Sequence, residues 1–130
     1  MPSTPEKHLY EYAIVQFVPR VEREEAINVG LVMMCKRRRW LRARTLVDRD
    51  RILAFAPQTD ICTLEGQLAS FGAVADGCKG SPISALETHE RFRWLTAVRS
   101  ACISTTRPHP GLTNDLDATF CRLFAELVEA

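Results

Sequence analysis

A short charged segment, residues 19–25, holds the side chains best suited to bind an ionic ligand. Its sequence is Pro-Arg-Val-Glu-Arg-Glu-Glu, and it joins two runs that are apolar enough to be buried strands. With an asparagine just beyond it, the segment supplies the candidate ligand-binding groups Arg20, Arg23, Glu24, Glu25 and Asn28. Guanidinium groups bind carboxylates and phosphates through paired hydrogen bonds, so these residues could clamp an anionic or planar polar ligand. The same charges could instead form ion pairs that only fix the turn, and the residues alone leave both alternatives open.

The run that follows this link contains Asn28 and Gly30, two residues that are unfavourable inside a buried strand. A glycine in a strand often marks a close approach of another backbone or of a ligand. The link is also too long for a tight hairpin, so we expect it to adopt a specific shape.

A second group of basic residues comes much later in the chain and comprises Arg93, Arg99, Arg107 and His109. If a short strand expected at 101–106 pairs beside the first strand, these groups could converge near Glu24 and Glu25. Three guanidinium groups and a histidine could then bind phosphate or carboxylate. Alternatively, Arg93 pairs with Glu90 on its own helix, and the other groups lie on loop surfaces.

The most basic stretch of the chain is residues 36–44, Lys-Arg-Arg-Arg-Trp-Leu-Arg-Ala-Arg. Its candidate recognition residues are Lys36, Arg37, Arg38, Arg39, Trp40, Arg42 and Arg44. Strand alternation places Trp40, Arg42 and Arg44 on one face, which would suit single-stranded nucleic acid or an acidic protein surface. A charged strand edge that prevents aggregation of sheets is the other interpretation. The net charge of the whole chain is only +1, which argues against a dedicated nucleic-acid-binding protein.

The sequence carries no motif for metal binding, cofactor binding or nucleophilic catalysis. Its three histidines are isolated, and its five cysteines are widely spaced without a C-x-x-C pair. Cys35, Cys62 and Cys121 fall on apolar patterns and are expected to be reduced core residues. There is no P-loop, no G-x-G-x-x-G and no G-x-S-x-G. We therefore expect no cofactor, no metal site and no catalytic residues.

The length and composition suit a single globular domain, since the chain has 130 residues of which 46% are hydrophobic. We expect one domain over residues 1–130, with a loose arm over 1–7. The N-terminus lacks the apolar run of an export signal, and no apolar run is long enough to cross a bilayer. The expected location is therefore the cytoplasm, away from the membrane.

The hydrophobic pattern predicts an α+β fold in which helices pack on a small, mainly antiparallel sheet of about four strands, in the order βββαααβα. The expected strands cover residues 9–18, 29–35, 39–47 and 101–106. The first of these is apolar on both sides, so helices should cover both faces of the sheet. The expected helices begin after caps at Asp48, at Asp60, at Ser84 and at Asn114 or Asp115. Residues 108–111, Pro-His-Pro-Gly, are expected to form a rigid loop.

Three blocks of the sequence resemble one bacterial family. The first is Y-x-Y-x-x-V-x-x-V-P-x-V-x-R-E-E-x-x-N-V-G over residues 10–30, and the second is Glu-Arg-Phe-Arg-Trp-Leu-Thr-Ala over 90–97, followed by Arg99 and Ser100. The third is His-Pro-Gly-Leu over 109–112, before an acidic helix start. Together they resemble the domain-of-unknown-function family numbered 3037 over nearly the whole chain. The resemblance implies a small stand-alone bacterial protein and supplies no catalytic residues. It also implies genes near those of HipA-like kinases, and so a protein partner encoded nearby, for which such a kinase is one candidate.

From the residues and the resemblance together, we expect a non-enzymatic partner-binding or regulatory module that uses the charged link and the basic hairpin as recognition surfaces. The lack of any specific catalytic motif is the main reason. The first alternative is nucleic-acid binding or processing through residues 36–44. The second is an enzyme of unrecognised type that uses Arg93, His109 and the carboxylates of the link. That alternative predicts one pocket in which these groups meet beside Asn28.

Overall fold

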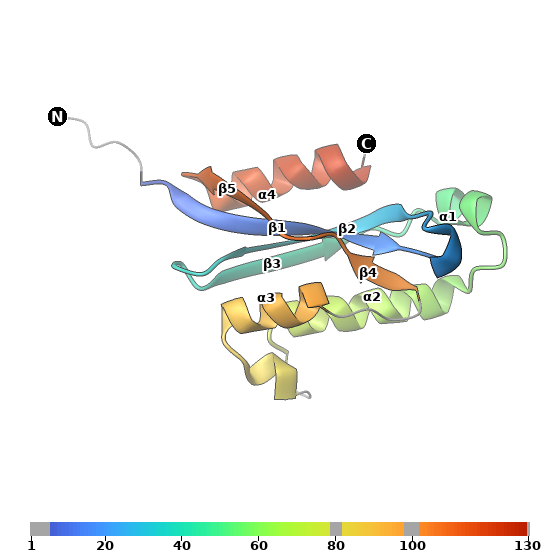
Figure 1. Cartoon of the computed structure of the whole chain (residues 1–130), viewed down its shortest axis with the longest axis horizontal. Coiled ribbons are helices and arrows are strands. Elements are labelled where there is room, and N and C mark those ends of the chain that lie inside the picture. The colour runs from blue at the N-terminus through green and yellow to red at the C-terminus, as the bar shows by residue number, and fades with distance from the viewer. Residues whose placement is uncertain (1–5, 79–81, 98–101, 130) are drawn as a thin grey trace.

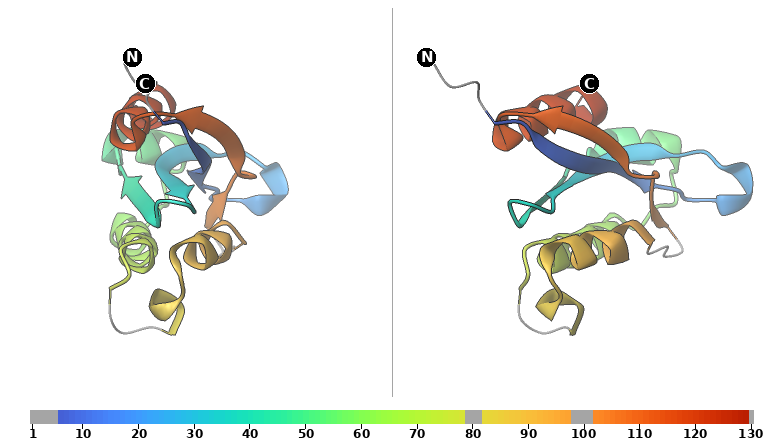
Figure 2. Two further views of the ribbon diagram at one scale, coloured as in Figure 1. Left: turned by 90° about the vertical axis from the view of Figure 1, so that its left-hand side faces the viewer. Right: turned by 60° about the vertical axis from the view of Figure 1, so that its left-hand side comes forward.

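In the described part of the chain, five antiparallel strands form one sheet that carries helices on both faces (Figures 1 and 2). This computed structural model describes residues 6–78, 82–97 and 102–129. The strands are β1 (His8–Phe17), β2 (Ile27–Cys35), β3 (Trp40–Thr45), β4 (Ile103–Thr105) and β5 (His109–Thr113). The α-helices are α1 (Arg49–Phe55), α2 (Ile61–Ala75), α3 (Thr88–Ala97) and α4 (Leu116–Phe124). Short 3-10 turns cover Val21–Arg23 and Pro82–Ala85, and π-helical turns over Ala125–Glu129 extend α4. The predicted α+β class is confirmed.

The strand order places β1 in the middle of the sheet. The order is β3-β2-β1-β4, and β5 also pairs with β1. Since β2 occupies one edge of β1, the other edge is shared by β4, opposite residues 15–17, and β5, opposite residues 8–12. The predicted antiparallel hairpin of β2 and β3 is confirmed. The β1–β2 link and the β2–β3 turn therefore lie at opposite ends of the sheet.

Two hydrophobic cores lie on the two faces of the sheet, as the apolar composition of β1 predicts. One core joins Ala13, Val15 and Phe17 of β1 to α1, α2 and α3. The other joins Tyr10 and alternate residues of β2 to the apolar face of α4, which is formed by Leu116, Phe120, Leu123 and Phe124. Because both faces are buried, polar function is confined to the strand ends, the sheet edges and the outer surfaces of the helices.

A β-bulge explains why Gly30 stands inside a buried strand. Val15 pairs with Gly30, but Gln16 pairs with Asn28, so Val29 is an extra residue in β2. A Cβ added at Gly30 would lie 2.9 Å from the Arg44 carbonyl oxygen and 3.2 Å from the Val15 Cβ. The close approach expected from this glycine is therefore between neighbouring strands of the sheet.

The prediction of a rigid loop over residues 108–111 is wrong, because His109–Thr113 forms β5 and pairs with the start of β1. Proline and glycine made this segment look like a loop, but proline is tolerated at a sheet edge. Gly111 lies opposite Tyr10, and a Cβ at Gly111 would collide with the Tyr10 ring. The glycine thus leaves room for an aromatic ring on the neighbouring strand.

Three of the predicted helix caps are confirmed, because Asp48, Asp60 and Asp115 each accept a hydrogen bond from a backbone N–H of the first turn. The cap predicted at Ser84 is wrong, since Ser84 lies in a 3-10 turn and α3 begins only at Thr88. No helix within residues 6–78, 82–97 and 102–129 is long and apolar enough to span a membrane.

The expected burial of the cysteines holds for only one of the three. Cys35 is buried, as predicted for a residue at the end of β2. Cys62 and Cys121 are exposed, because the apolar stripes of α2 and α4 face the sheet and these two residues point away from it.

Candidate functional site

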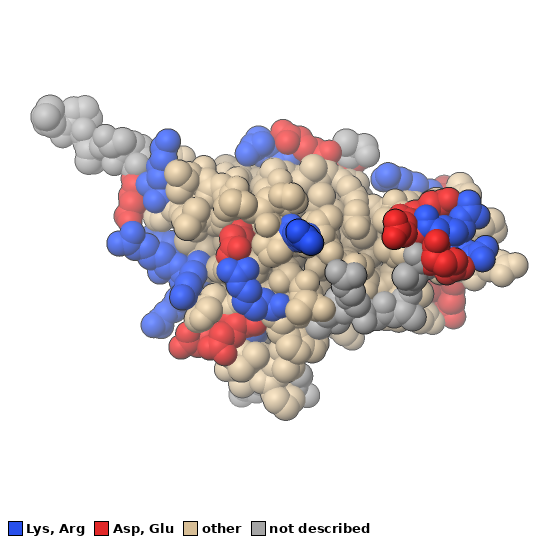
Figure 3. All heavy atoms as spheres, viewed as in Figure 1, with Lys and Arg blue, Asp and Glu red and all other residues tan. Residues whose placement is uncertain are grey.

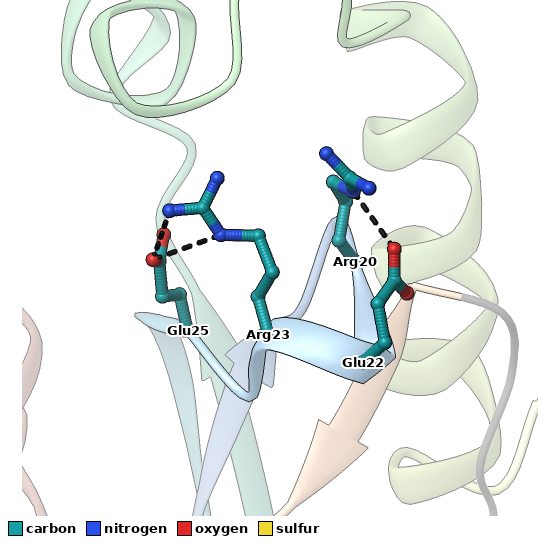
Figure 4. Close-up of polar contacts among 4 residues, drawn as sticks. All are labelled: Arg20, Glu22, Arg23 and Glu25. Atoms are coloured by element: carbon teal, nitrogen blue, oxygen red, sulfur yellow. Dashed lines mark hydrogen bonds and ion pairs between the residues drawn. The ribbon is translucent and has the colours of Figure 1, made fainter.

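The link between β1 and β2 holds two ion pairs formed within the link itself (Figure 4). The Nε of Arg20 donates to Oε1 of Glu22 at 2.8 Å. Arg23 donates from Nε and Nη2 to Oε1 of Glu25, at 3.1 and 2.7 Å. These four side chains are about half exposed or more, and an exposed ion pair contributes at most about 1 kcal/mol. The pairs shape the link, yet they are weak enough for an incoming anion to compete with them.

The two arginines stand between their carboxylate partners. In Figure 4 the Arg20 and Arg23 side chains rise from the same side of the 3-10 turn, while Glu22 and Glu25 stand on the outer flanks. A guanidinium group has five N–H donors. Arg20 uses one of them and Arg23 uses two in hydrogen bonds within the described part of the chain. Both groups therefore keep donors that can bind an oxyanion.

Both arginines line a cavity of about 630 Å³ at the end of the sheet. The opposite wall is the connection between α1 and α2, residues 56–60, together with the first turns of α2. This volume lies within the range of roughly 300–1,000 Å³ that is usual for ligand pockets. The charged link is therefore one wall of a cavity, which a solvated loop alone would not provide.

The cavity offers both apolar surface and hydrogen-bonding groups. Pro19, Phe55 and Pro57 supply the accessible apolar surface, above the buried side chains of Phe17 and Leu64. Gln58 and Gln67 supply side-chain amides. A ligand that pairs an apolar body with a negatively charged group would match this lining. The arrangement is suited to binding, because apolar surface gives affinity and the arginines fix orientation.

Local capping shapes the wall opposite the link. Asp60 caps α2 by accepting a hydrogen bond from the Thr63 N–H at 3.2 Å, and that hydrogen bond lowers the pKa of Asp60 below its ordinary value. Thr59 donates from its hydroxyl to the Ala56 carbonyl oxygen at 2.7 Å. These hydrogen bonds, each between residues three positions apart, hold residues 56–60 in one shape, so this wall is preformed.

The Glu22 carboxylate has a lowered pKa, first because its own backbone N–H donates to it and second because of the Arg20 guanidinium. Both donors stabilise the ionised form, and this carboxylate holds Arg20 from outside the cavity.

Two of the candidate residues in this region do not line the cavity. Glu24 is exposed at a positive φ of 55° and makes no hydrogen bond or ion pair within the described part of the chain. Asn28 donates to the Leu127 carbonyl oxygen at 3.0 Å and accepts from Gln16 at 3.1 Å. Its side chain is hydrogen-bonded to the C-terminal turns over Ala125–Glu129 and does not line the cavity beside the arginines.

The convergence of Arg93 and His109 on the link, one of the two alternatives drawn from the sequence, is not formed in the structure. β4 does pair with β1, as that prediction required. Arg93, however, pairs with Glu11, through two hydrogen bonds of 3.0 and 2.6 Å, and neither with Glu90 nor with the link. Glu11 precedes the end of β1 by six residues, about 20 Å of extended chain. The carboxylates of the link lie beyond that end of β1.

His109 and the remaining arginines of this group are also placed away from the cavity. His109 is exposed on β5, opposite Tyr12, with its ring centroid 5.3 Å from that of Tyr12. Arg107 is exposed, and Arg99 lies outside the described residues. The single pocket that the enzyme alternative predicted is therefore not formed by Arg93, His109 and Asn28.

The predicted face of Trp40, Arg42 and Arg44 exists, but α4 covers much of it. The Arg42 guanidinium lies 4.6 Å from the centroid of the Phe120 ring, and that of Arg44 lies 4.6 Å from the centroid of Phe124. Trp40 packs edge-on against Phe120, with centroids 6.2 Å apart. These cation–π and aromatic contacts hold α4 on the sheet. Trp40 is thus engaged in packing and is poorly placed to stack on a base.

The β2–β3 turn carries most of the exposed cations of the basic hairpin, and Arg44 of β3 is exposed as well. The cations of the turn are Lys36, Arg37, Arg38 and Arg39, all exposed and without an ion pair in the described part of the chain. They lie about 30 Å from the charged link, the length of the nine residues of β2. Figure 3 shows both charges intermingled at the end that holds the link, and several blue side chains with red ones beside them at the other end.

One group of possible metal ligands lies within the described residues, although none was predicted. Glu87, His89 and Glu90 bring one ligand atom each to within 4.8 Å of one another at the start of α3. The carboxylates are exposed, and His89 Nδ1 lies 3.6 Å from a Glu87 oxygen. This group is separate from the cavity.

The sequence did not predict the α1–α2 side of the site. The signal available was the run Ala-Pro-Gln-Thr-Asp over 56–60, which ends one helix and caps the next. Such a run predicts a well-formed connection between two helices, but its position opposite the link depends on how α1 and α2 pack on the sheet.

Comparison with known proteins gives one family. The model for the family described as "Protein of unknown function (DUF3037)" matches residues 12–128, nearly the whole chain. No curated protein matches the chain. No solved structure matches it either.

Proposed function

The chain belongs to the DUF3037 family, and we propose that it is a non-enzymatic partner-binding or regulatory module of the cytoplasm whose recognition site is the cavity beside residues 19–25. One observation carries the proposal: two arginines with unused donors border a preformed, largely apolar cavity. None of the described lining residues is a histidine, and Arg93 and His109 lie elsewhere. This arrangement favours recognition over catalysis.

The chemistry of the cavity defines the partner. It should present an apolar side chain for Phe55 and Pro57 together with an anionic group for Arg20 and Arg23. Following the family resemblance, the first protein to test is the product of a neighbouring gene, and a HipA-like kinase is the leading candidate. Exposed ion pairs cost little to rearrange, so binding would exchange the pairs of the link for pairs with the partner.

The test is co-expression of the chain with that gene product, followed by isothermal titration calorimetry of the purified partners. We expect a stable complex that the Arg20→Ala and Arg23→Ala double variant weakens by about 2–4 kcal/mol, because charge-assisted hydrogen bonds are lost. The matched control is the Arg37→Ala and Arg38→Ala double variant, which removes two exposed arginines at the far end of the sheet and should leave the affinity unchanged. Equal loss in both double variants would show that general charge, and not the cavity, drives association.

The exposed cations of the β2–β3 turn support one second candidate, nucleic-acid binding. Such binding would fall steeply with salt and would be lost in the Arg37→Ala and Arg38→Ala variant. The packing of Trp40 against Phe120 weakens this candidate, since it takes away the aromatic platform that single strands need. A fluorescence anisotropy titration with single-stranded RNA at two salt concentrations decides it.

A further inference from the structure

We propose that the cavity binds the C-terminus of a partner chain, with the terminal carboxylate held between Arg20 and Arg23 and the last, apolar side chain packed against Pro19, Phe55 and Pro57. This inference rests on the proposed function, because it names the chemical group that the same cavity recognises.

The unused donors of the two arginines support a carboxylate at this position. Arg20 commits only its Nε to Glu22, which leaves both terminal nitrogens of its guanidinium. Arg23 commits Nε and Nη2 to Glu25, which leaves Nη1. In Figure 4 the carboxylates of the link occupy the outer flanks, so neither fills the space between the two guanidinium groups. A planar carboxylate can accept from both sides of such a gap.

The charge of the lining favours a monoanion over a phosphate. Arg20 and Arg23 contribute two positive charges to the cavity, and Glu25 and Asp60 contribute two negative charges. A carboxylate adds one negative charge, whereas a dianionic phosphate would place a second beside Glu25 and Asp60. Because the charges of the lining sum to zero, a dianion is disfavoured more strongly than a monoanion.

The proximity of apolar and cationic surface favours a chain end over an internal acidic segment. At a C-terminus the carboxylate and the last side chain share one Cα, so both enter one cavity together. An internal segment would also have to bury its peptide groups on both sides, and each buried group without a partner costs free energy. The side-chain amides of Gln58 and Gln67 can serve the one or two peptide groups that precede a terminus.

The carboxylates of the link act as internal competitors of this ligand. Glu25 lines the cavity and holds two donors of Arg23, so replacing it with glutamine frees donors and removes a like charge. Exposed ion pairs are weak, so we expect the Glu25→Gln variant to bind a terminal carboxylate about two- to five-fold more tightly. A purely structural network would not respond in this direction.

The experiment is a nuclear magnetic resonance titration of the full chain with acetylated tetrapeptides that end in leucine, as the free acid or as the C-terminal amide. We expect the free acid to shift the Nε–H signals of Arg20 and Arg23, and the amide to bind about 10-fold or more weakly. Inorganic phosphate serves as a second anion, and the Arg37→Ala variant as a matched control with unchanged affinity.

Three results would overturn the inference. The acid and the amide could bind equally, phosphate could bind more tightly than the acid, or no peptide could shift Arg20 and Arg23 at millimolar concentration. The double variant of Arg20 and Arg23 separates this inference from the proposed function. If that variant fails to bind the gene product, each of the three results refutes the chain-end ligand only, and the proposed function stands. If the complex with the gene product did not depend on the two arginines, the proposed function would fail as well.

Discussion

Replacement of Gly30 by alanine tests whether the bulge in β2 leaves no room for a side chain. Gly30 stands where the register between β1 and β2 shifts. It lies near the end of β2 that joins the link. A Cβ there would meet the Arg44 carbonyl oxygen at 2.9 Å, the Thr45 Cγ2 at 3.1 Å and the Val15 Cβ at 3.2 Å. The first of these atoms belongs to the backbone of β3, so it cannot move without disturbing the sheet.

The magnitude follows from two opposing effects. Adding a methyl group to a closely packed core costs about 1–3 kcal/mol of unfolding free energy. Replacing glycine with alanine also restricts the unfolded chain, which returns about 0.4–1 kcal/mol. The expected net loss of stability is therefore about 1–2 kcal/mol.

The assay is urea unfolding followed by circular dichroism. For a small protein a loss of this size lowers the unfolding midpoint by roughly 0.5–1 M urea. The matched control is the same substitution at Gly66, inside α2, where a Cβ would meet nothing within 4 Å. Alanine is a better helix former than glycine, so the Gly66→Ala variant should gain about 0.5–1 kcal/mol.

The distinguishing result is that the same substitution lowers the unfolding free energy at Gly30 and raises it at Gly66. If Gly30→Ala unfolds at or above the midpoint of the unsubstituted protein, the strands are not closely packed at the bulge. The glycine would then need another explanation, and a ligand at this part of β2 would return as a candidate.

Three further substitutions test other parts of the structure. Asn28→Ala removes the hydrogen bond to the Leu127 carbonyl oxygen and should lower the unfolding free energy by about 1–3 kcal/mol. Amide hydrogen exchange in the C-terminal turns should become faster, and unchanged exchange would contradict the role of Asn28 in holding them. Arg44→Met keeps the aliphatic stem but loses the cation over Phe124, so we expect a loss of about 0.5–2 kcal/mol in urea unfolding, and no loss would refute the cation–π contact. The pKa of Asp60 is lowered in the folded state, so its stabilising effect is present above its unfolded-state pKa and is lost as pH falls through the folded-state value. Asp60→Asn keeps the cap without the titration, so its Tm should fall less below about pH 4; parallel Tm curves would exclude this role.

The parts of the fold that follow from local chemistry were predictable. Asp48, Asp60 and Asp115 precede apolar helical stripes, and each caps a helix. The apolar composition of β1 on both sides required helices on both faces of the sheet. These signals arise from residues close together in the sequence, where the backbone and its caps interact directly.

The missed elements depend on contacts between distant residues. Pro110 and Gly111 have the composition of a loop, and only the pairing with β1 and the ring of Tyr10 make this segment a strand. Ser84 has the spacing of a capping box, but the chain forms a 3-10 turn there and starts α3 later. Tertiary pairing overrode local preference in the first case, and an alternative local turn did so in the second.

The candidate site shows the same division. The link was recognised from its charges, and Arg20, Arg23 and Glu25 do line a cavity. The residues that complete it, 56–60, carry no charge pattern that points to the link. Arg93 could not be paired correctly from sequence, because its partner Glu11 is identified only by the position of α3 over β1.

The central claim is that the cavity itself, and not only its charges, is the recognition site. Calorimetry on two tryptophan variants of α2 tests it most directly, with the neighbouring gene product as the titrant. Gln67→Trp would fill the cavity without changing any charge, whereas Ala69→Trp places the same side chain on an exposed position of α2. We predict that Gln67→Trp weakens binding by about 10-fold or more, roughly 1.4 kcal/mol, and that Ala69→Trp binds like the unsubstituted protein. Equal affinity of both variants would contradict the claim.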